Sequence, residues 1–190
     1  GFDGAGHTIK NLYIHRPTEN QVGLFSMLGK LSAYIEAHIA NVTLTGGSVT
    51  GKVNVGSVVG YVEGGYLRNL RNFNTVTGES HVGGITGVLS KSYGNMARID
   101  NAYNAGEIGT FGVTDEVGGI VGRVSNTIVQ SAANVGEVRG KNDVGGVAGS
   151  FSGVAERLEN IYNTGLVEGQ DAVGGILGHL RRNGEILNGY

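Results

Sequence analysis

Cysteine and tryptophan are absent from this 190-residue chain, and proline occurs once. Without cysteine the chain has no disulfide, no thiolate metal site and no cysteine nucleophile. The scarcity of proline excludes a collagen helix, which needs proline together with a glycine at every third residue. Apolar runs stay far below the roughly 18 residues of a membrane-spanning helix, so we expect no direct membrane insertion.

An excess of basic residues is also missing. The chain carries 14 Lys and Arg against 16 Asp and Glu, for a net charge of −2. Nucleic-acid binding draws largely on clustered Lys and Arg, so no nucleic-acid partner is expected. Disorder is excluded because 39% of the residues are hydrophobic and only 16% are charged.

Glycine is abundant, with 36 copies, and it recurs in a block of the form V-G-G-[IV]-x-G. Clear copies begin at Val82, Val117, Val144 and Val173, and related copies begin at Val22 and Val55. Successive starting valines are 27 to 35 residues apart. One period holds three short apolar segments, each too short for a helix, which is typical of stacked strands.

We therefore predict an all-β fold, a right-handed parallel β-helix (β-solenoid) of about six coils with three short strands per coil. Residues 1–190 are expected to form a single domain that is a fragment of a longer repeat protein. Sparse glycine and longer repeat steps predict inserted loops at 29–39 and 90–98.

The paired glycines are expected to bend the chain, so that the valine before them and the aliphatic residue after them both point inward. Gly122 is expected on the inward face of its strand, and Gly140 in a polar turn that tolerates a side chain. The predicted corner glycines are Gly83, Gly84, Gly118, Gly119, Gly145, Gly146, Gly174 and Gly175.

Asparagine recurs at two repeat positions, where stacked side-chain amides can hydrogen-bond from coil to coil as ladders. The first series is Asn11, Asn41, Asn69, Asn101, Asn160 and Asn188, with Ser131 in one coil. The second is Asn72, Asn104, Asn134 and Asn163. Two residues after the first series stand Tyr13, Tyr103, Tyr162 and Tyr190, a broken row that could stack on sugar rings or cover the corner.

Asp115, Glu116, Asp143 and Asp171 precede three of the glycine blocks and are expected to stack on one corner. A solvated corner that keeps the protein soluble is the main interpretation. Weak Ca²⁺ binding is the second and paired-carboxylate glycoside chemistry the third. No H-E-x-x-H or G-x-S-x-G motif is present, so we expect no enzyme activity, no catalytic residues and no cofactor beyond weak Ca²⁺.

The segments "GAGHTIKNL" (4–12) and "HRPTENQVGLF" (15–25), with the recurring V-G-G-[IV]-x-G block, resemble the GLUG repeat of large bacterial surface proteins. Together, "NLYIHRP" and "VGLF" look most like filamentous-haemagglutinin-type exoproteins of two-partner secretion systems. GLUG repeats also stand beside zinc-dependent IgA1 proteases. The resemblance spans essentially the whole chain and implies a long secreted β-helix used in adhesion, aggregation or biofilm cohesion.

The predicted function is thus a structural or adhesive segment of a secreted bacterial surface adhesin. Its expected partners are extracellular polysaccharide, a host or other cell surface, or a second copy of the rod. Two alternatives stay open, namely the non-catalytic β-helix of an IgA1-protease-like zinc peptidase and a polysaccharide-degrading β-helix enzyme.

Overall fold

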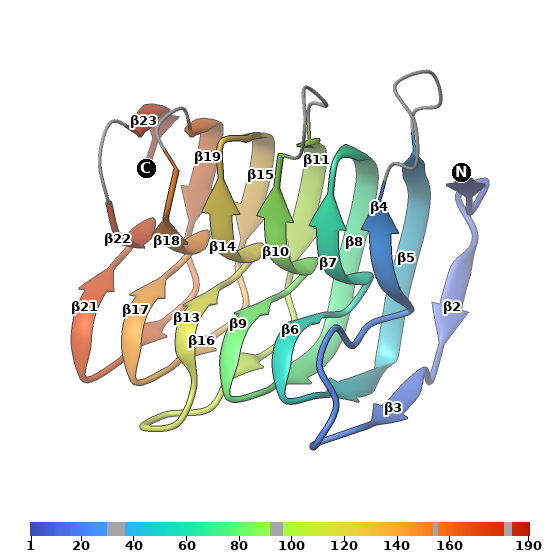
Figure 1. Ribbon diagram of the computed structural model, residues 1–190, viewed down its shortest axis with the longest axis horizontal. Coiled ribbons are helices and arrows are strands. Elements are labelled where there is room, and N and C mark those ends of the chain that lie inside the picture. Colours follow the sequence, from blue (N-terminus) through green and yellow to red (C-terminus); the bar gives the residue numbers. More distant parts are fainter. Residues whose placement is uncertain (30–36, 92–96, 154–155, 181–183) are drawn as a thin grey trace.

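The computed structural model describes residues 1–29, 37–91, 97–153, 156–180 and 184–190. These residues form 23 strands and no helix. Successive coils stack side by side along one axis (Figure 1). The predicted parallel β-solenoid is therefore confirmed. The described residues include no helix that is long and apolar enough to cross a membrane.

Three parallel sheets run along the stack, and we call them A, B and C. Sheet A has twelve strands, namely β1 (Phe2–Asp3), β2 (Thr8–Lys10), β3 (Tyr13–His15), β5 (His38–Thr50), β8 (Gly65–Thr77), β11 (Ala97–Asn104), β12 (Ile108–Gly109), β15 (Ile128–Asn134), β16 (Val138–Arg139), β19 (Arg157–Asn163), β20 (Val167–Glu168) and β23 (Glu185–Gly189).

Sheets B and C are built from the two halves of the glycine block. Sheet B consists of β6 (Val53–Gly56), β9 (Ser80–Gly83), β13 (Asp115–Gly118), β17 (Asn142–Gly145) and β21 (Asp171–Gly174). Sheet C consists of β4 (Phe25–Gly29), β7 (Val59–Glu63), β10 (Thr86–Ser90), β14 (Val121–Ser125), β18 (Ala148–Phe151) and β22 (Leu177–His179). The first coil reaches sheet B only through a bridge between Val22 and Val55.

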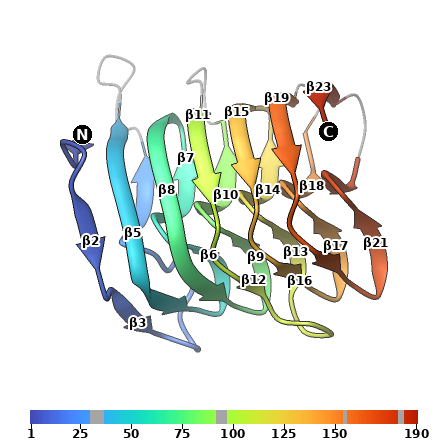
Figure 2. The same ribbon diagram turned by 180° about the vertical axis from the view of Figure 1, so that it is seen from behind.

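The solenoid winds to the right. In Figure 1 the strands of sheet C run upward on the near face, and Figure 2 shows β8, β11, β15 and β19 running downward on the opposite face. The chain meanwhile advances from right to left in Figure 1. Rotation and advance in these senses make a right-handed screw, as the crossover preference predicts.

The glycine bend separates two hydrophobic clusters. Val117, before the bend, is fully buried with Val82, Val144 and the other valines of its row. Ile120, after the bend, is fully buried in the larger cluster between sheets A and C. Both side chains point inward, as expected, but they enter different cores.

The corner glycines fit their positions because side chains would overlap neighbouring backbone. Gly83, Gly118, Gly145 and Gly174 end the strands of sheet B, and Gly84, Gly119, Gly146 and Gly175 follow them. A Cβ on Gly119 would overlap the Gly146 carbonyl and lie 2.5 Å from Oδ1 of Asn134. A Cβ on Gly175, in the last coil, meets nothing within 4 Å.

Of two further glycine expectations, one holds and one was wrong. Gly122 is buried, and a Cβ there would be crowded, as expected, because it would lie 2.5 Å from the Val82 nitrogen in β9, where sheets B and C approach each other. Gly140 does not lie in an open turn. It is buried, and a Cβ there would overlap Val117 and lie 2.8 Å from Cγ2 of Val144.

The second asparagine series forms a buried chain of amides, which we call the inner ladder. Nδ2 of Asn72, Asn104 and Asn134 donates to Oδ1 of the next member over 2.7–2.8 Å, and the chain ends at Asn163. Each Nδ2 also donates to the carbonyl two residues later. The buried amides thereby satisfy most of their own hydrogen-bonding capacity.

The first series forms an exposed ladder, which we call the outer ladder. Asn69 donates to Asn41, Asn101 to Asn69, and Asn188 to Asn160, over 2.8–3.0 Å. All of these residues, and Ser131 between them, adopt left-handed backbone with φ of 52–58°. Asparagine tolerates this conformation better than most residues, which explains its recurrence.

Asn11 and Tyr13 were wrongly aligned with these rows. Strand β2 pairs with β5 so that Ile9 lies beside Leu44, five residues beyond the expected partner. Asp3, not Asn11, accepts the amide of Asn41, over 2.9 Å. Tyr13 lies beside Ser48, whereas Tyr103 shares its row with Arg71 and Ala133.

The predicted loops at 29–39 and 90–98 fall largely on residues outside the described ranges. Their described ends belong to strands, with Gly29 closing β4, His38 opening β5, Ser90 closing β10 and Ala97 opening β11. The single-domain assignment and the larger parent protein remain predictions.

Candidate functional site

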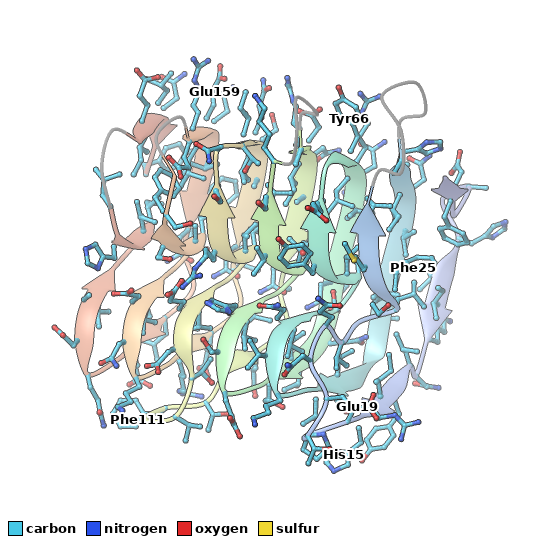
Figure 3. The ribbon with its side chains drawn as sticks, viewed as in Figure 1. His15, Glu19, Phe25, Tyr66, Phe111 and Glu159 are labelled. Carbon is cyan, nitrogen blue, oxygen red and sulfur yellow. The ribbon has the colours of Figure 1, made fainter. Side chains whose placement is uncertain are left out.

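The outer corner between sheets B and C carries a row of mostly polar side chains from each sheet. On sheet B, the residue before each block valine contributes Asn54, His81, Glu116, Asp143 and Ala172. On sheet C, the facing row is Tyr61, Val88, Arg123, Ser150 and His179. We call the space between these rows the corner groove. Figure 3 shows side chains standing along this line on the near face.

Backbone geometry explains why the sheet B row points into the groove. All five of its residues have left-handed backbone, with φ between 50° and 59°. A single left-handed residue reorients the strand just before the block valine turns inward. Asn, Asp and His accept this conformation more readily than most residues, while Glu116 and Ala172 hold it at greater cost.

A row of glycines brings the two walls together. Gly87, Gly122, Gly149 and Gly178 lie in sheet C, where a Cβ would stand 2.5–2.6 Å from the backbone carbon of a groove residue one coil earlier. Those residues are Asn54, His81, Glu116 and Asp143. The last glycine of the block therefore sets the width of the groove.

Glu116 is the centre of the groove. It is only 8% exposed, and its carboxylate receives two hydrogen bonds from Arg123, including Nε to Oε2 at 2.6 Å. Ser150, one coil later, donates to the same Oε2 over 2.5 Å. His81, one coil earlier, places Nε2 3.7 Å from it. Three coils thus converge on one carboxylate.

These contacts set the protonation states. Burial acts to raise the pKa of Glu116, but the hydrogen bonds from Arg123 and Ser150 and the nearby positive charge outweigh it, so the pKa is lowered. Burial, with the charge of Arg123, lowers the pKa of His81 despite Glu116 and Asp115. At neutral pH the groove therefore holds an ionised Glu116 and an uncharged His81.

The four predicted acids do not form one solvated stripe. Glu116 and Asp143 belong to the recessed row, and Asp143, 7% exposed, lies 3.1 Å from Nδ1 of His179. Asp115 and Asp171 stand in the adjacent row, separated by Asn142, whose Nδ2 donates to Asp115 over 2.8 Å. No group of three or more Asp, Glu or His side chains suited to a metal ion occurs within the described residues.

A second cavity continues the groove toward the first coils. The larger cavity, about 720 Å³, extends from His81 to His179, and the second, about 300 Å³, extends from Arg123 to Tyr61. His81 and Arg123 line both. Four residues of the groove were missed in the sequence because no motif places them near the acids. These residues are Arg123, Ser150, His179 and Tyr61. Their shared position after the last glycine of each block was the available signal.

The groove offers hydrogen-bond donors and acceptors at short intervals, which suits binding. The Ser150 hydroxyl donates to Glu116, whose carboxylate is also held by Arg123. His81 directs Nδ1 toward Oδ1 of Asn54 at 2.9 Å.

Comparison with known proteins places the fold without assigning the chain to a family. The sequence matches no family model. Halomucin of Haloquadratum walsbyi is 45% identical over 69 residues, which is 36% of this chain and 1% of halomucin. The chain therefore spans only a small fraction of that relative.

One solved structure resembles almost the whole chain. It is a candidate immunoglobulin A1 protease from Bacteroides ovatus, which matches with a TM-score of 0.54 and 24% sequence identity. The match covers 98% of this chain and 48% of the Bacteroides chain. At this level of identity the likeness shows the β-solenoid fold alone.

Proposed function

We propose that the chain is a non-enzymatic segment of a large secreted or cell-surface protein, where it forms part of a rod used in attachment, aggregation or biofilm cohesion. The observation that carries the proposal is the parallel register, which continues through all three sheets from coil to coil. The same faces therefore recur along the stack. A recurring face suits many weak contacts with an extended partner such as polysaccharide, another cell or a second rod.

The comparisons support an external location for this rod. Part of the chain is similar to halomucin, and the fold of the chain is that of a candidate immunoglobulin A1 protease. The resemblance to GLUG repeats and to two-partner-secretion exoproteins favours the adhesin form of the proposal. In that form the segment supplies length and a binding face, and other parts of the parent protein supply secretion and anchoring.

A second candidate is the non-catalytic β-helix of a secreted peptidase of the IgA1 protease type. The structural likeness to the Bacteroides ovatus protein favours it. In this case a catalytic domain lies elsewhere in the parent protein, and the present chain positions that domain or its substrate.

A polysaccharide-degrading enzyme is the weakest of the three. Glycoside hydrolysis pairs an ionised carboxylate with a carboxyl group that stays protonated near neutral pH. The groove lowers the pKa of Glu116 and neutralises its charge with Arg123. This chemistry supports a binding role for the groove.

Deletion of the segment equivalent to residues 1–190 from the parent protein tests the proposal, with surface display checked by antibody. We expect attachment or aggregation to fall while any hydrolytic activity stays unchanged. Loss of a hydrolytic activity with unchanged attachment would replace the adhesin proposal with one of the two enzyme-linked alternatives.

A further inference from the structure

We propose that the corner groove is a binding site for neutral oligosaccharide chains. The inference rests on the proposed role of the chain as a surface-exposed rod, and it specifies where and what that rod binds. It is carried by the shape of the groove, by its balance of charge and by the alternation of donors and acceptors along it.

The groove has the shape for an extended ligand. Its sheet C wall crosses five adjacent strands, β7, β10, β14, β18 and β22. At about 4.8 Å per strand these cover roughly 19 Å along the stack, enough for several linked sugar rings. His81 and Arg123 line both cavities, so the two lie next to each other and one oligosaccharide can contact both.

The charges of the groove disfavour anionic ligands. Asp115, Glu116, Asp143 and Asp171 line the larger cavity, and Arg123, its one permanently charged cation, is already paired with Glu116. Uronates, sulfated glycans and nucleic acids would meet net negative charge. The ligand is therefore neutral or cationic.

Donor and acceptor groups decide between these two. Cations need acceptors only, yet Arg123, Asn142 and His179 place donor groups beside the carboxylates of the larger cavity. Hydroxyl groups donate and accept, and so match both kinds. In Asp115 and Asp171 one oxygen accepts a hydrogen bond within the protein, and the other has no partner among the described residues. Those oxygens can accept from sugar hydroxyls.

The opposite end of the groove combines apolar side chains with the hydroxyls of Ser90, Ser125 and Ser152. Tyr61 and Val88 line the smaller cavity, and Met27, 43% exposed, lies beside Tyr61 in the neighbouring strand. Sugar rings present C–H faces that pack on aromatic and other apolar side chains, while their hydroxyls seek planar polar groups. The smaller cavity therefore offers contacts for the C–H faces and for the hydroxyls, and the larger cavity adds further partners for the hydroxyls.

Titration calorimetry of the 190-residue chain tests the inference. The neutral probes are hexamers of β-1,4-glucose, α-1,4-glucose, mannose and N-acetylglucosamine, and the charged probes are a galacturonate hexamer and hexalysine. We expect at least one neutral hexamer to bind. Tyr61→Ala and the pair Asp115→Ala/Asp171→Ala should each weaken it about tenfold. Tyr66→Ala, in β8 of sheet A and outside the lining of both cavities, is the matched control and should bind normally, and circular dichroism checks that each variant is folded.

The inference fails if no neutral hexamer binds, if hexalysine or galacturonate binds instead, or if the groove variants bind as well as the control. The two proposals fail separately. If the groove variants have no effect while the parent deletion abolishes attachment, only the proposed binding site in the groove is refuted. If a neutral hexamer binds in the groove while the parent deletion leaves attachment intact, only the proposed function of the rod is refuted. Release of new reducing ends from a bound hexamer would support the proposed site and would show that the site is catalytic.

Discussion

At the scale of single residues, the repeat depends on contacts between its glycines and its asparagines. The second glycine of a block lies against the inner-ladder amide one coil later, so Gly84 meets Asn104, Gly119 meets Asn134 and Gly146 meets Asn163. The glycine leaves room for the amide, and the amide in turn donates to the backbone carbonyl two residues later. Each residue type therefore accounts for the position of the other.

This pairing predicts unequal effects for the same substitution in different coils. Gly119→Ala should lower the free energy of unfolding by about 2–4 kcal/mol, because its Cβ overlaps buried backbone and the Asn134 amide. Gly175→Ala, at the same repeat position with nothing within 4 Å, should change it by less than about 0.5 kcal/mol. Urea unfolding of both variants measures the difference. Similar losses in the two would argue against the contact.

At the scale of strands, the sequence predicts the regular parts and misses those that depend on neighbours outside the repeat. The glycine block identifies sheets B and C because its apolar residues directly reflect burial of the strand. The first coil was misaligned because β2 lies against β5 five residues away from the position that the Asn11 match implied. An identical residue in two repeats therefore does not determine the register in which the two strands pair.

The groove was only partly predictable for the same reason. The four acids were found, but alternation along a strand predicts Glu116 and Asp143 on a solvated corner. Left-handed backbone and the close approach of β18 to β13 and of β22 to β17 bury them instead. Their partners come from other strands and other coils, at separations of 7, 34 and 36 residues. Such pairings become visible only once the register of the coils is known.

The Glu116–Arg123 pair joins β13 to β14, and its removal should show coupling. Arg123→Met leaves a carboxylate that is 8% exposed without its cation, which should cost about 2 kcal/mol at neutral pH, allowing for the partly solvated guanidinium. Glu116→Gln combined with Arg123→Met should restore most of that loss. Urea midpoints of the two single variants and the double variant form the measurement. Strictly additive losses would show that the pair is not a unit.

At the scale of the whole molecule, the stack behaves as a one-dimensional array in which each coil contacts only its neighbours. Strand pairing in sheet A links β8 to β11, β11 to β15, β15 to β19 and β19 to β23 in sequence. Buried side chains are concentrated in the middle coils, and every residue of β23 is exposed. Stability in such an array is a sum of coil and interface contributions rather than a property of one central core.

Native-state hydrogen exchange of the 190-residue chain should therefore reveal a gradient. Amides of β11 and β15, which have paired strands on both sides, should exchange only through the largest openings. Amides of β21 and β23 should exchange through openings whose free energy is lower by a few kcal/mol than that of β11 and β15. The reason is that unfolding of β21 and β23 exposes little further apolar surface. Gly119→Ala should lower the protection of β13 and β17 more than that of β4, since its overlaps lie in neighbouring coils. Uniform protection from β4 to β23, or an equal response of all strands to the substitution, would instead show that the coils unfold as a single cooperative unit.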